Sequence, residues 1–492
     1  MKRRIGIVIG LCLLACGAAW AAPLAQKAQT KTEYMVVLVG GQKLGYVENV
    51  RRADGNTVVT SQRMVLTVKR MGMALRLEQS ESSVESSGGE PLSFSSRQNL
   101  GVAAQTAEGT IKDGKATVTV SSGRDVRQTE MAWPDGALLS EALRLLSVRK
   151  GFKEGTRYTA KAFMPSLLKA VDANVTIGAS KQVDLLGRVV ELTEARTVMT
   201  GPTGRIESVG YLNADGDALK TVTPMMGMQM EMVACTKEFA TMPGESVDLF
   251  SKVFVESPAP LGNLGGAKSV TYRVEPTDSS AKASAKLDFL ESPSQKVARD
   301  GNSIVVTVCP VAGRGGAFPY KGADPAAVKA LKPTAYLQSD AGEVAALARK
   351  AVAGAKDAAG AARQIQDFVS KYVTRKDLSV GYATALEVAR SRQGDCSEHA
   401  VLAAAMCRAA GLPAQVIMGV VYVENRGDKR DVFAPHAWFR VLIDGVWVDY
   451  DAALGSYDAG HIALSAGDGE PGDLFGVVNT LGNFRIAEAT KQ

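Results

Sequence analysis

Histidine and cysteine are scarce in this chain, whose 492 residues include three histidines and six cysteines. No two cysteines form a Cys-x-x-Cys pair, so there is little from which to build a zinc site, and we expect no metal or other cofactor.

Four alternating methionines over residues 226–232 could bind a soft metal, but such side chains more commonly fill a buried strand. Cys235 and Cys309 could pair in an oxidising compartment. Cys396 and Cys407 lie roughly 16 Å apart along one expected helix and cannot bridge.

Basic runs and long apolar runs are also lacking. Beyond the first 21 residues, no apolar run is long enough to span a bilayer. No basic run is interleaved with aromatic residues, which argues against a nucleic-acid partner. The net charge is +6, and three of these charges lie within the first 21 residues, so the remainder is close to neutral.

The N-terminus has the features of a secretory signal peptide. Three basic residues (2–4) precede an apolar run (5–16), and Ala19-Trp20-Ala21 offers a small-residue cleavage site. We therefore expect residues 1–21 to be removed and the protein to be periplasmic or secreted. The alternative is a lipid anchor, because Leu13-Leu14-Ala15 before Cys16 resembles a bacterial lipobox. We expect contact with a membrane only if Cys16 is lipidated.

The rest of the chain divides into regions of different pattern. Residues 30–245 read as long alternating strands with hairpin turns, and one helix is expected over residues 137–150. This predicts a curved antiparallel sheet wrapped on a helix, rather like a lipoprotein-carrier half-barrel. Residues 246–325 are expected to be a linker with additional strands. Residues 326–490 read as helices followed by antiparallel strands, which predicts an α+β domain.

The sequence around Cys396 predicts a reactive thiol. Residues 394–400 read Gly-Asp-Cys-Ser-Glu-His-Ala, and the apolar stretch that follows stops at Gly411-Leu412-Pro413. Cys396 is therefore expected in the first turn of a helix of about four turns. Unpaired N–H groups and the helix dipole there favour a thiolate over a thiol. A buried, inert cysteine is the alternative reading of this position taken alone.

A hairpin about forty residues later supplies partners for this thiol. Asp444-Gly445 lies between two alternating apolar runs and favours a type I′ turn. Counting outward from that turn, Arg440 faces Asp449, and His436 becomes a diagonal neighbour of Asp451 on the same face. A histidine oriented by a carboxylate, together with a cysteine at a helix start, is the arrangement that activates a thiol nucleophile.

These blocks resemble the transglutaminase-like core of bacterial proteins. The resemblance rests on Gly-Asp-Cys-Ser-Glu-His-Ala, His436-Ala-Trp and Trp447-Val-Asp-Tyr-Asp451, and it covers roughly residues 326–490. It implies a papain-like fold and a Cys–His–Asp triad, which would be Cys396, His436 and Asp451. The fold class expected is thus α+β, a transglutaminase-like domain preceded by a β-rich antiparallel region. Ala452-Ala453 departs from the Pro-Thr usual in that family.

Other residues near this site are candidates for supporting roles. His399 follows Cys396 by three positions, but its place in the motif is typical of packing rather than catalysis. Asp449 faces Arg440 and is expected to be half of a surface ion pair. The resemblance implies a structural hydrogen-bonding role for His461. Tyr372 and Tyr382 are candidates for a second oxyanion donor beside the backbone N–H of Cys396.

The expected activity is that of an extracytoplasmic thiol enzyme acting on amide or peptide bonds of a protein or peptide substrate. Its acyl-enzyme would form on Cys396, and hydrolysis is favoured because water is abundant outside the cytoplasm. One alternative is a protein-glutamine crosslinker, in which an amine replaces water. Another is a binding or scaffold protein that keeps the fold without catalysis. Thiol enzymes that act on small acyl donors or glycosylated asparagines are a further alternative.

The signal peptide generates a prediction about the mature N-terminus. The mature chain should begin at Ala22 and partition into the soluble extracytoplasmic fraction, because cleavage is expected after Ala21. N-terminal mass analysis of the protein from cell fractions measures this. A chain that begins with a diacylglyceryl-modified Cys16 would contradict free secretion.

Overall fold

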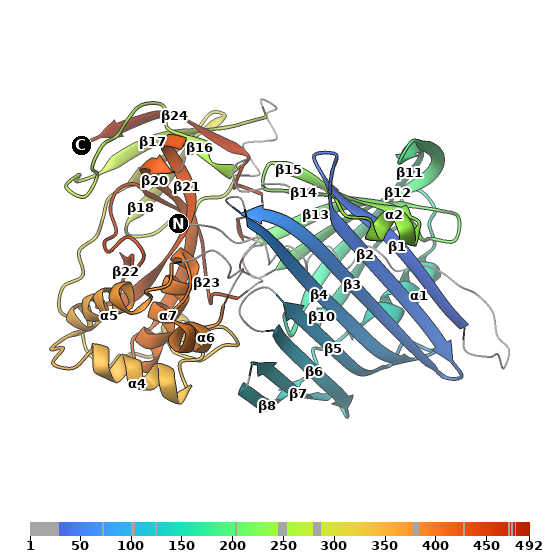
Figure 1. Cartoon of the computed structure of the whole chain (residues 1–492), viewed down its shortest axis with the longest axis horizontal. Coiled ribbons are helices and arrows are strands. Elements are labelled where there is room, and N and C mark those ends of the chain that lie inside the picture. Colours follow the sequence, from blue (N-terminus) through green and yellow to red (C-terminus); the bar gives the residue numbers. More distant parts are fainter. Residues whose placement is uncertain are drawn as a thin grey trace. The chain divides into compact units, whose positions relative to one another are not determined.

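The computed structural model describes residues 29–70, 73–99, 104–123, 125–201, 204–244, 253–278, 287–376, 383–426, 429–470, 473, 476–477 and 479–492. The expected signal peptide and Cys16 lie outside these residues. The chain forms two compact units that divide between Asp248 and Leu249 (Figure 1). Among the described residues, no helix combines the length and apolar character needed to cross a bilayer.

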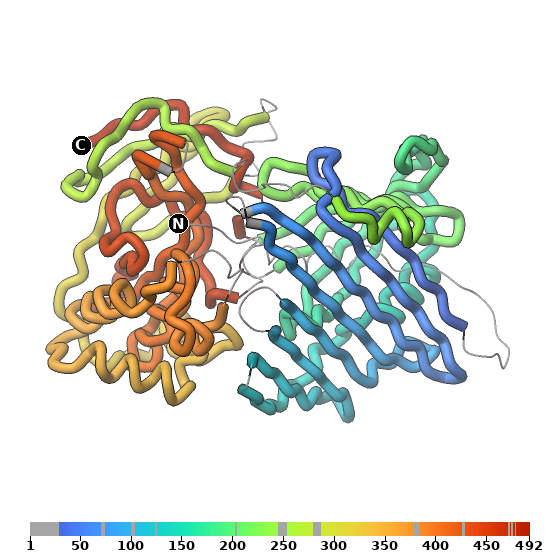
Figure 2. Tube along the Cα trace, in the orientation of Figure 1, coloured from blue at the N-terminus to red at the C-terminus, as the bar shows by residue number. Residues whose placement is uncertain are grey.

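The N-terminal unit is built on one antiparallel sheet of 15 strands. Strands β1 to β8 follow one another in sequence order from the middle of the sheet to one edge, and β15 to β9 lead back to the other edge. Their early members are the adjacent blue strands of Figure 2. The exception to antiparallel pairing is β9, which is parallel to β10. The strands are β1 (Gln29–Val39), β2 (Gln42–Asp54), β3 (Thr57–Arg70), β4 (Met73–Ser86), β5 (Pro91–Asn99), β6 (Ala104–Lys112), β7 (Lys115–Ser122), β8 (Asp125–Ala132), β9 (Ala137–Leu138), β10 (Arg157–Met164), β11 (Lys169–Leu185), β12 (Arg188–Gly201), β13 (Gly204–Leu212), β14 (Ala218–Met225) and β15 (Met228–Cys235).

Two helices, α1 (Ser140–Lys150) and α2 (Lys237–Thr241), accompany this sheet. The helix expected over residues 137–150 is shorter than predicted, because residues 137 and 138 pair with β10 instead. Helix α1 packs against β3, β4, β9 and β10. Of the four alternating methionines, Met230 and Met232 in β15 are buried core residues, whereas Met228 is half-buried and Met226 lies in the turn before β15.

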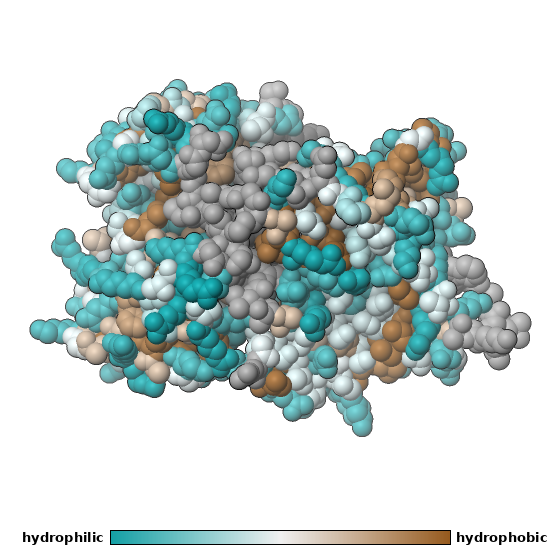
Figure 3. Space-filling view, viewed as in Figure 1, coloured by the Kyte–Doolittle hydropathy of each residue, from teal (hydrophilic) through white to brown (hydrophobic). Residues whose placement is uncertain are grey.

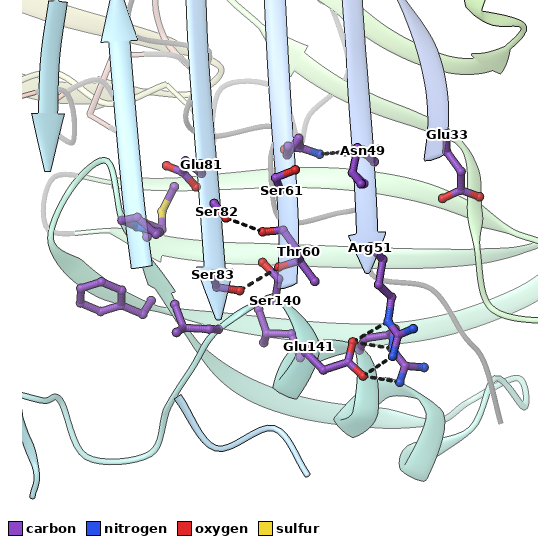
Figure 4. Close-up of a pocket in the computed structure, with 18 of the residues that line it drawn as sticks. Glu33, Asn49, Arg51, Thr60, Ser61, Glu81, Ser82, Ser83, Ser140 and Glu141 are labelled. Atoms are coloured by element: carbon purple, nitrogen blue, oxygen red, sulfur yellow. Dashed lines mark hydrogen bonds and ion pairs between the residues drawn. The ribbon is translucent and has the colours of Figure 1, made fainter. Parts of the chain in front are cut away.

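A buried polar network joins α1 to the sheet. The Glu85 carboxylate, from β4, accepts hydrogen bonds from the backbone N–H groups of Glu141 (2.7 Å) and Ala142 (2.9 Å) at the start of α1. It thereby caps the helix, whose own N-cap residue Leu139 makes no side-chain cap. The Glu141 carboxylate in turn accepts from Arg51 and Arg144. Arg51, Glu141 and Arg144 line part of a cavity between the sheet and α1, where Figure 4 labels Arg51 and Glu141.

The C-terminal unit is arranged around one buried helix, α7 (Cys396–Ala409). Of its 14 residues, 13 are buried, because both strands and helices pack against it. Strands β20 and β21 contact it, as do α4, α5 and α6. Hydrophilic side chains cover much of the helical part of this unit seen in Figure 3. The remaining elements before α7 are β16 (Val255–Glu256), β17 (Val270–Pro276), β18 (Gln295–Asp300), β19 (Ser303–Val308), α3 (Pro325–Lys329), α4 (Gly342–Ala351), α5 (Ala358–Tyr372) and α6 (Ala385–Ser391).

Two sheets complete this unit. In the first, the order is β16-β21-β20-β23 with β22 paired to β21, and in the second it is β18-β19-β17-β24. The strands after α7 are β20 (Ala414–Arg426), β21 (Lys429–Ile443), β22 (Val446–Tyr450), β23 (His461–Gly467) and β24 (Phe484–Lys491). The Gln295 side-chain amide joins the two sheets, since it donates to the Ala463 carbonyl (2.8 Å) and accepts from the Ala463 N–H (2.8 Å).

Residues 246–325, expected as a linker with additional strands, contribute to both of these sheets through β16, β17, β18 and β19. The chain's last strand, β24, pairs with β17.

All four cysteines in the described residues are free thiols, so Cys235 and Cys309 are not paired here. Cys407 is fully buried, as expected of a core residue, and burial raises the pKa of its thiol.

The Glu85 cap generates a prediction about stability. Glu85→Ala should lower the free energy of unfolding by about 2–3 kcal/mol, because two buried helix N–H groups lose their acceptor. Urea denaturation followed by circular dichroism measures the change. Glu108→Ala, the same change at an exposed site in β6, is the matched control and should stay within about 0.5 kcal/mol of wild type. Equal effects of the two variants would contradict the capping role.

Candidate active site

Cys396 is the first residue of α7, as the sequence predicted. The helix start is fixed by a capping box: the Asp395 carboxylate accepts from the Ser397 N–H (3.0 Å), and the Glu398 carboxylate accepts from the Asp395 N–H (3.0 Å). Gly394 is required beside it, because its φ is +149° and an added Cβ would lie 2.1 Å from Glu398 Cβ. The Gly-Asp-Cys sequence therefore aims the thiol from a rigid helix terminus.

The hairpin that carries His436 has the predicted register. Ile443 pairs with Val446, Leu442 with Trp447 and Arg440 with Asp449. Asp444 and Gly445 have φ values of +48° and +79°, as a type I′ turn requires. Strand β22 ends at Tyr450, so Asp451 lies one residue beyond it. Helix α7 packs directly on β21, the strand that holds His436.

His436 and Asp451 form a buried hydrogen-bonded pair. Nε2 of His436 lies 2.6 Å from Oδ2 of Asp451, and their side chains are fully buried. A carboxylate can only accept, so the proton is on Nε2, and Nδ1 is the ring nitrogen able to act as a base. The other oxygen, Oδ1, accepts from the N–H groups of Ala453 (2.7 Å) and Leu454 (3.1 Å). This turn holds the carboxylate in one orientation.

A second histidine contacts the same carboxylate. Nε2 of His461 lies 3.1 Å from Oδ2 of Asp451, and its Nδ1 lies 2.9 Å from Oδ1 of Asp458. Burial opposes a charge on Asp451, but the charges and hydrogen bonds of His436 and His461 outweigh it and hold the pKa of Asp451 well below its usual value. Asp451 is therefore an anion shared by two imidazoles.

The comparisons with known proteins bear on this geometry. The model of the Transglutaminase-like superfamily matches residues 345–452, which begin within α4 and end just after Asp451. The segment is a transglutaminase-like domain. The expected fold class, a transglutaminase-like domain preceded by a β-rich antiparallel region, is thus confirmed.

Three solved structures are similar to parts of the chain. A protein of Cytophaga hutchinsonii described as a candidate cysteine protease is 18% identical, with a TM-score of 0.30, over 46% of this chain and 83% of its own. A β-barrel-like protein of Brucella abortus is 12% identical, with a TM-score of 0.34, over 43% of this chain and 98% of its own. A candidate protease of Parabacteroides distasonis is 14% identical, with a TM-score of 0.20, over 74% of this chain and 66% of its own. No curated protein matches the sequence.

Within the transglutaminase-like domain, Asp449 differs from its prediction. It is buried rather than part of a surface ion pair, and its Oδ1 accepts from Nε1 of Trp438 at 3.0 Å. Burial raises the pKa of Asp449 above its usual value, against the effect of the Trp438 hydrogen bond. Its cross-strand neighbour Arg440 donates instead to Gln415 (2.9 and 2.6 Å) and lies over the ring of Trp447. Asp449 thus fixes the indole ring, which lies beside His436.

The other candidates have local roles. Nδ1 of His399 donates to the backbone carbonyl of Asp395 (2.6 Å) within α7, and burial lowers the pKa of this imidazole. The Tyr372 hydroxyl donates to the Ala389 carbonyl (2.6 Å). Tyr382 lies outside the described residues. The hydrogen bonds of His399 and Tyr372 thus go to backbone carbonyls of α7's N-cap residue and of α6.

The same imidazoles and carboxylate could also hold a metal ion. One ligand atom from each of His436, His461 and Asp451 lies within 4.8 Å of the other two. Nε2 of each histidine, however, is at hydrogen-bond distance from Oδ2 of Asp451, and all three side chains are buried. We interpret them as a hydrogen-bonded chain.

Sequence reasoning missed three features of this site. It gave His461 a structural hydrogen bond without placing it on Asp451, and it overlooked Asp458, three residues earlier. The turn between β22 and β23 brings Asp458 and His461 close to Asp451, and the sequence of this turn has no period-2 pattern from which the contact could be predicted. The capping box was also missed, although Asp395 and Glu398 have the spacing that announces one.

The buried position of Asp449 generates a prediction. Asp449→Ala should lower the free energy of unfolding by about 1–3 kcal/mol, because the Trp438 N–H would lose its buried acceptor. Asp449→Asn keeps an acceptor oxygen and removes a charge that burial disfavours, so it should change stability by less than about 1 kcal/mol. Urea denaturation compares the two variants. An alanine variant as stable as the asparagine variant would show that the contact with Trp438 contributes nothing.

Proposed function

We propose that the transglutaminase-like domain is a thiol enzyme that cleaves amide or peptide bonds through an acyl-enzyme on Cys396. The observation that carries this is the buried 2.6 Å contact between Nε2 of His436 and Oδ2 of Asp451. It leaves Nδ1 as the basic nitrogen, on a strand packed against the helix that begins at Cys396. Nucleophile, base and orienting carboxylate are the parts that thiol acyl transfer needs.

The reaction follows from these roles. His436 Nδ1 takes the proton of the Cys396 thiol, and the sulfur attacks the substrate carbonyl carbon. The backbone N–H of Cys396 at the helix start supports the resulting oxyanion. The His436 imidazolium gives its proton to the leaving nitrogen as the C–N bond breaks, and a thioester remains. His436 then takes a proton from the acceptor as it attacks the thioester carbon. The C–S bond breaks, the acyl group leaves on the acceptor, and the proton on His436 returns to the sulfur.

The acceptor decides which reaction results. Water gives a carboxylic acid, and this hydrolysis is the reaction we favour because the protein is proposed to act outside the cytoplasm. A primary amine would give a crosslinked or transferred product through the same thioester. The proposed extracytoplasmic location rests on the signal peptide, and the substrate is proposed to be a protein or peptide.

A labelled glutamine-containing peptide, offered with and without a primary amine, tests this function. Free acid in both reactions supports hydrolysis, and amine incorporation would mean crosslinking. No turnover of the peptide, together with a thiol at Cys396 that reacts no faster than a denatured cysteine, would favour a scaffold protein. Cys396→Ser is the control for background hydrolysis, because it removes the thiol with little change in volume.

The role of Asp451 generates a further prediction. Asp451→Asn should leave the fold intact and reduce kcat by about 10³- to 10⁴-fold, because an amide N–H facing Nε2 would favour the tautomer with its proton on Nδ1. Turnover of the labelled peptide measures this. Asp449→Asn is the matched control in the same hairpin and should retain most activity. Greater damage from the Asp449 change would overturn the assignment of Asp451.

A further inference from the structure

The His461 ring lies between two carboxylates, one at each nitrogen. Nε2 is 3.1 Å from Oδ2 of Asp451, and Nδ1 is 2.9 Å from Oδ1 of Asp458. Carboxylates accept hydrogen bonds and cannot donate them, so a proton on each nitrogen satisfies both contacts. The competing contact is longer: the Asp458 N–H lies 3.3 Å from Nδ1, which would then be the acceptor. The shorter contacts favour the doubly protonated ring.

We propose that His461 is a positioning residue, an imidazole that stays protonated throughout the reaction at neutral pH and keeps Asp451 ionised and directed at His436. This inference rests on the proposed function of Cys396 and His436. It differs from a simple structural hydrogen bond because it assigns a charge to His461. That charge is needed at the stages of the reaction in which His436 is neutral.

The buried carboxylate of Asp451 needs a positively charged neighbour at every stage of the reaction. In the proposed reaction His436 alternates between neutral and protonated states, while the Asp451 side chain is completely buried. Whenever His436 is neutral, Asp451 would be an uncompensated buried anion, which is costly in a protein interior. A protonated His461 supplies the missing counter-charge throughout the cycle. Asp458, which is 27% exposed, supports that charge from the solvent side.

Other titratable groups around His461 are consistent with this charge. Asp449 from β22 and Tyr457 from the turn before β23 lie nearby, and His436 faces it from β21 with ring centroids 5.7 Å apart. Burial disfavours the protonated ring, but the hydrogen bonds and charges of Asp451 and Asp458 outweigh burial and raise the pKa of His461 to about 9. The stabilisation this gives is complete below the unfolded value of about 6.5 and is lost as pH rises through about 9.

Nitrogen NMR of the mature protein labelled with ¹⁵N-histidine tests the proposal. The chain has only three histidines, so His399→Gln and His461→Gln assign the signals by elimination. At neutral pH both nitrogens of His461 should have the chemical shift of protonated nitrogens, with a midpoint near pH 9. Asp458→Asn removes one carboxylate and should lower that midpoint. A His461 ring with one unprotonated nitrogen at neutral pH would overturn the proposal.

The effect on His436 separates a charged role from a structural one. His461→Gln retains an N–H donor for Asp451 but carries no charge. The pH midpoint at which the His436 imidazole titrates should then rise by about one unit or more, because Asp451 is no longer shared with a second cation. An unchanged midpoint in a folded His461→Gln protein would also overturn the proposal; should that variant not fold, the Asp458→Asn titration decides. Neither readout requires turnover, so a failure of the proposed activity is recognised separately by the labelled-peptide assay.

Discussion

The site depends on one carboxylate, that of Asp451, whose two oxygens are both engaged. Oδ1 is held by two backbone N–H groups of the turn that follows β22, and Oδ2 faces the Nε2 atoms of His436 and His461. Its burial would make the charge unfavourable without these partners. The ionised carboxylate, the tautomer of His436 and the position of the turn are therefore one coupled arrangement.

That arrangement in turn constrains the surrounding strands. A one-residue slip between β21 and β22 would move His436 to the opposite face, so the type I′ turn at Asp444-Gly445 determines whether the pair can form. Gly419, opposite His436 on β20, is equally constrained: an added Cβ would lie 2.1 Å from the Ile462 carbonyl oxygen and 2.7 Å from the Trp438 ring. Close packing of β20 against β23 thus brings His461 next to Asp451.

The parts of the structure that could be predicted from sequence are local in the chain. The Gly411 stop and the Cys396 motif give α7, and the Asp444-Gly445 turn gives the register that brings His436 to Asp451. Contacts between distant segments could not be predicted. Glu85 caps a helix 55 residues later, and Gln295 joins a strand that contains Ala463. Asp449 was misread because alternation shows which residues share a face and does not show which face another layer will cover.

The central claim is that the His436–Asp451 pair makes Cys396 a thiolate. Its most direct test is the rate of Cys396 alkylation by iodoacetamide as a function of pH, mapped by mass spectrometry in wild type and His436→Ala. Rapid alkylation near neutral pH is predicted for wild type, with a slower reaction and a midpoint shifted toward about 8.5 in the variant. Buried Cys407 should react only after unfolding and serves as the internal control. A Cys396 that alkylates no faster than a denatured cysteine, or that is indifferent to His436, would contradict the account.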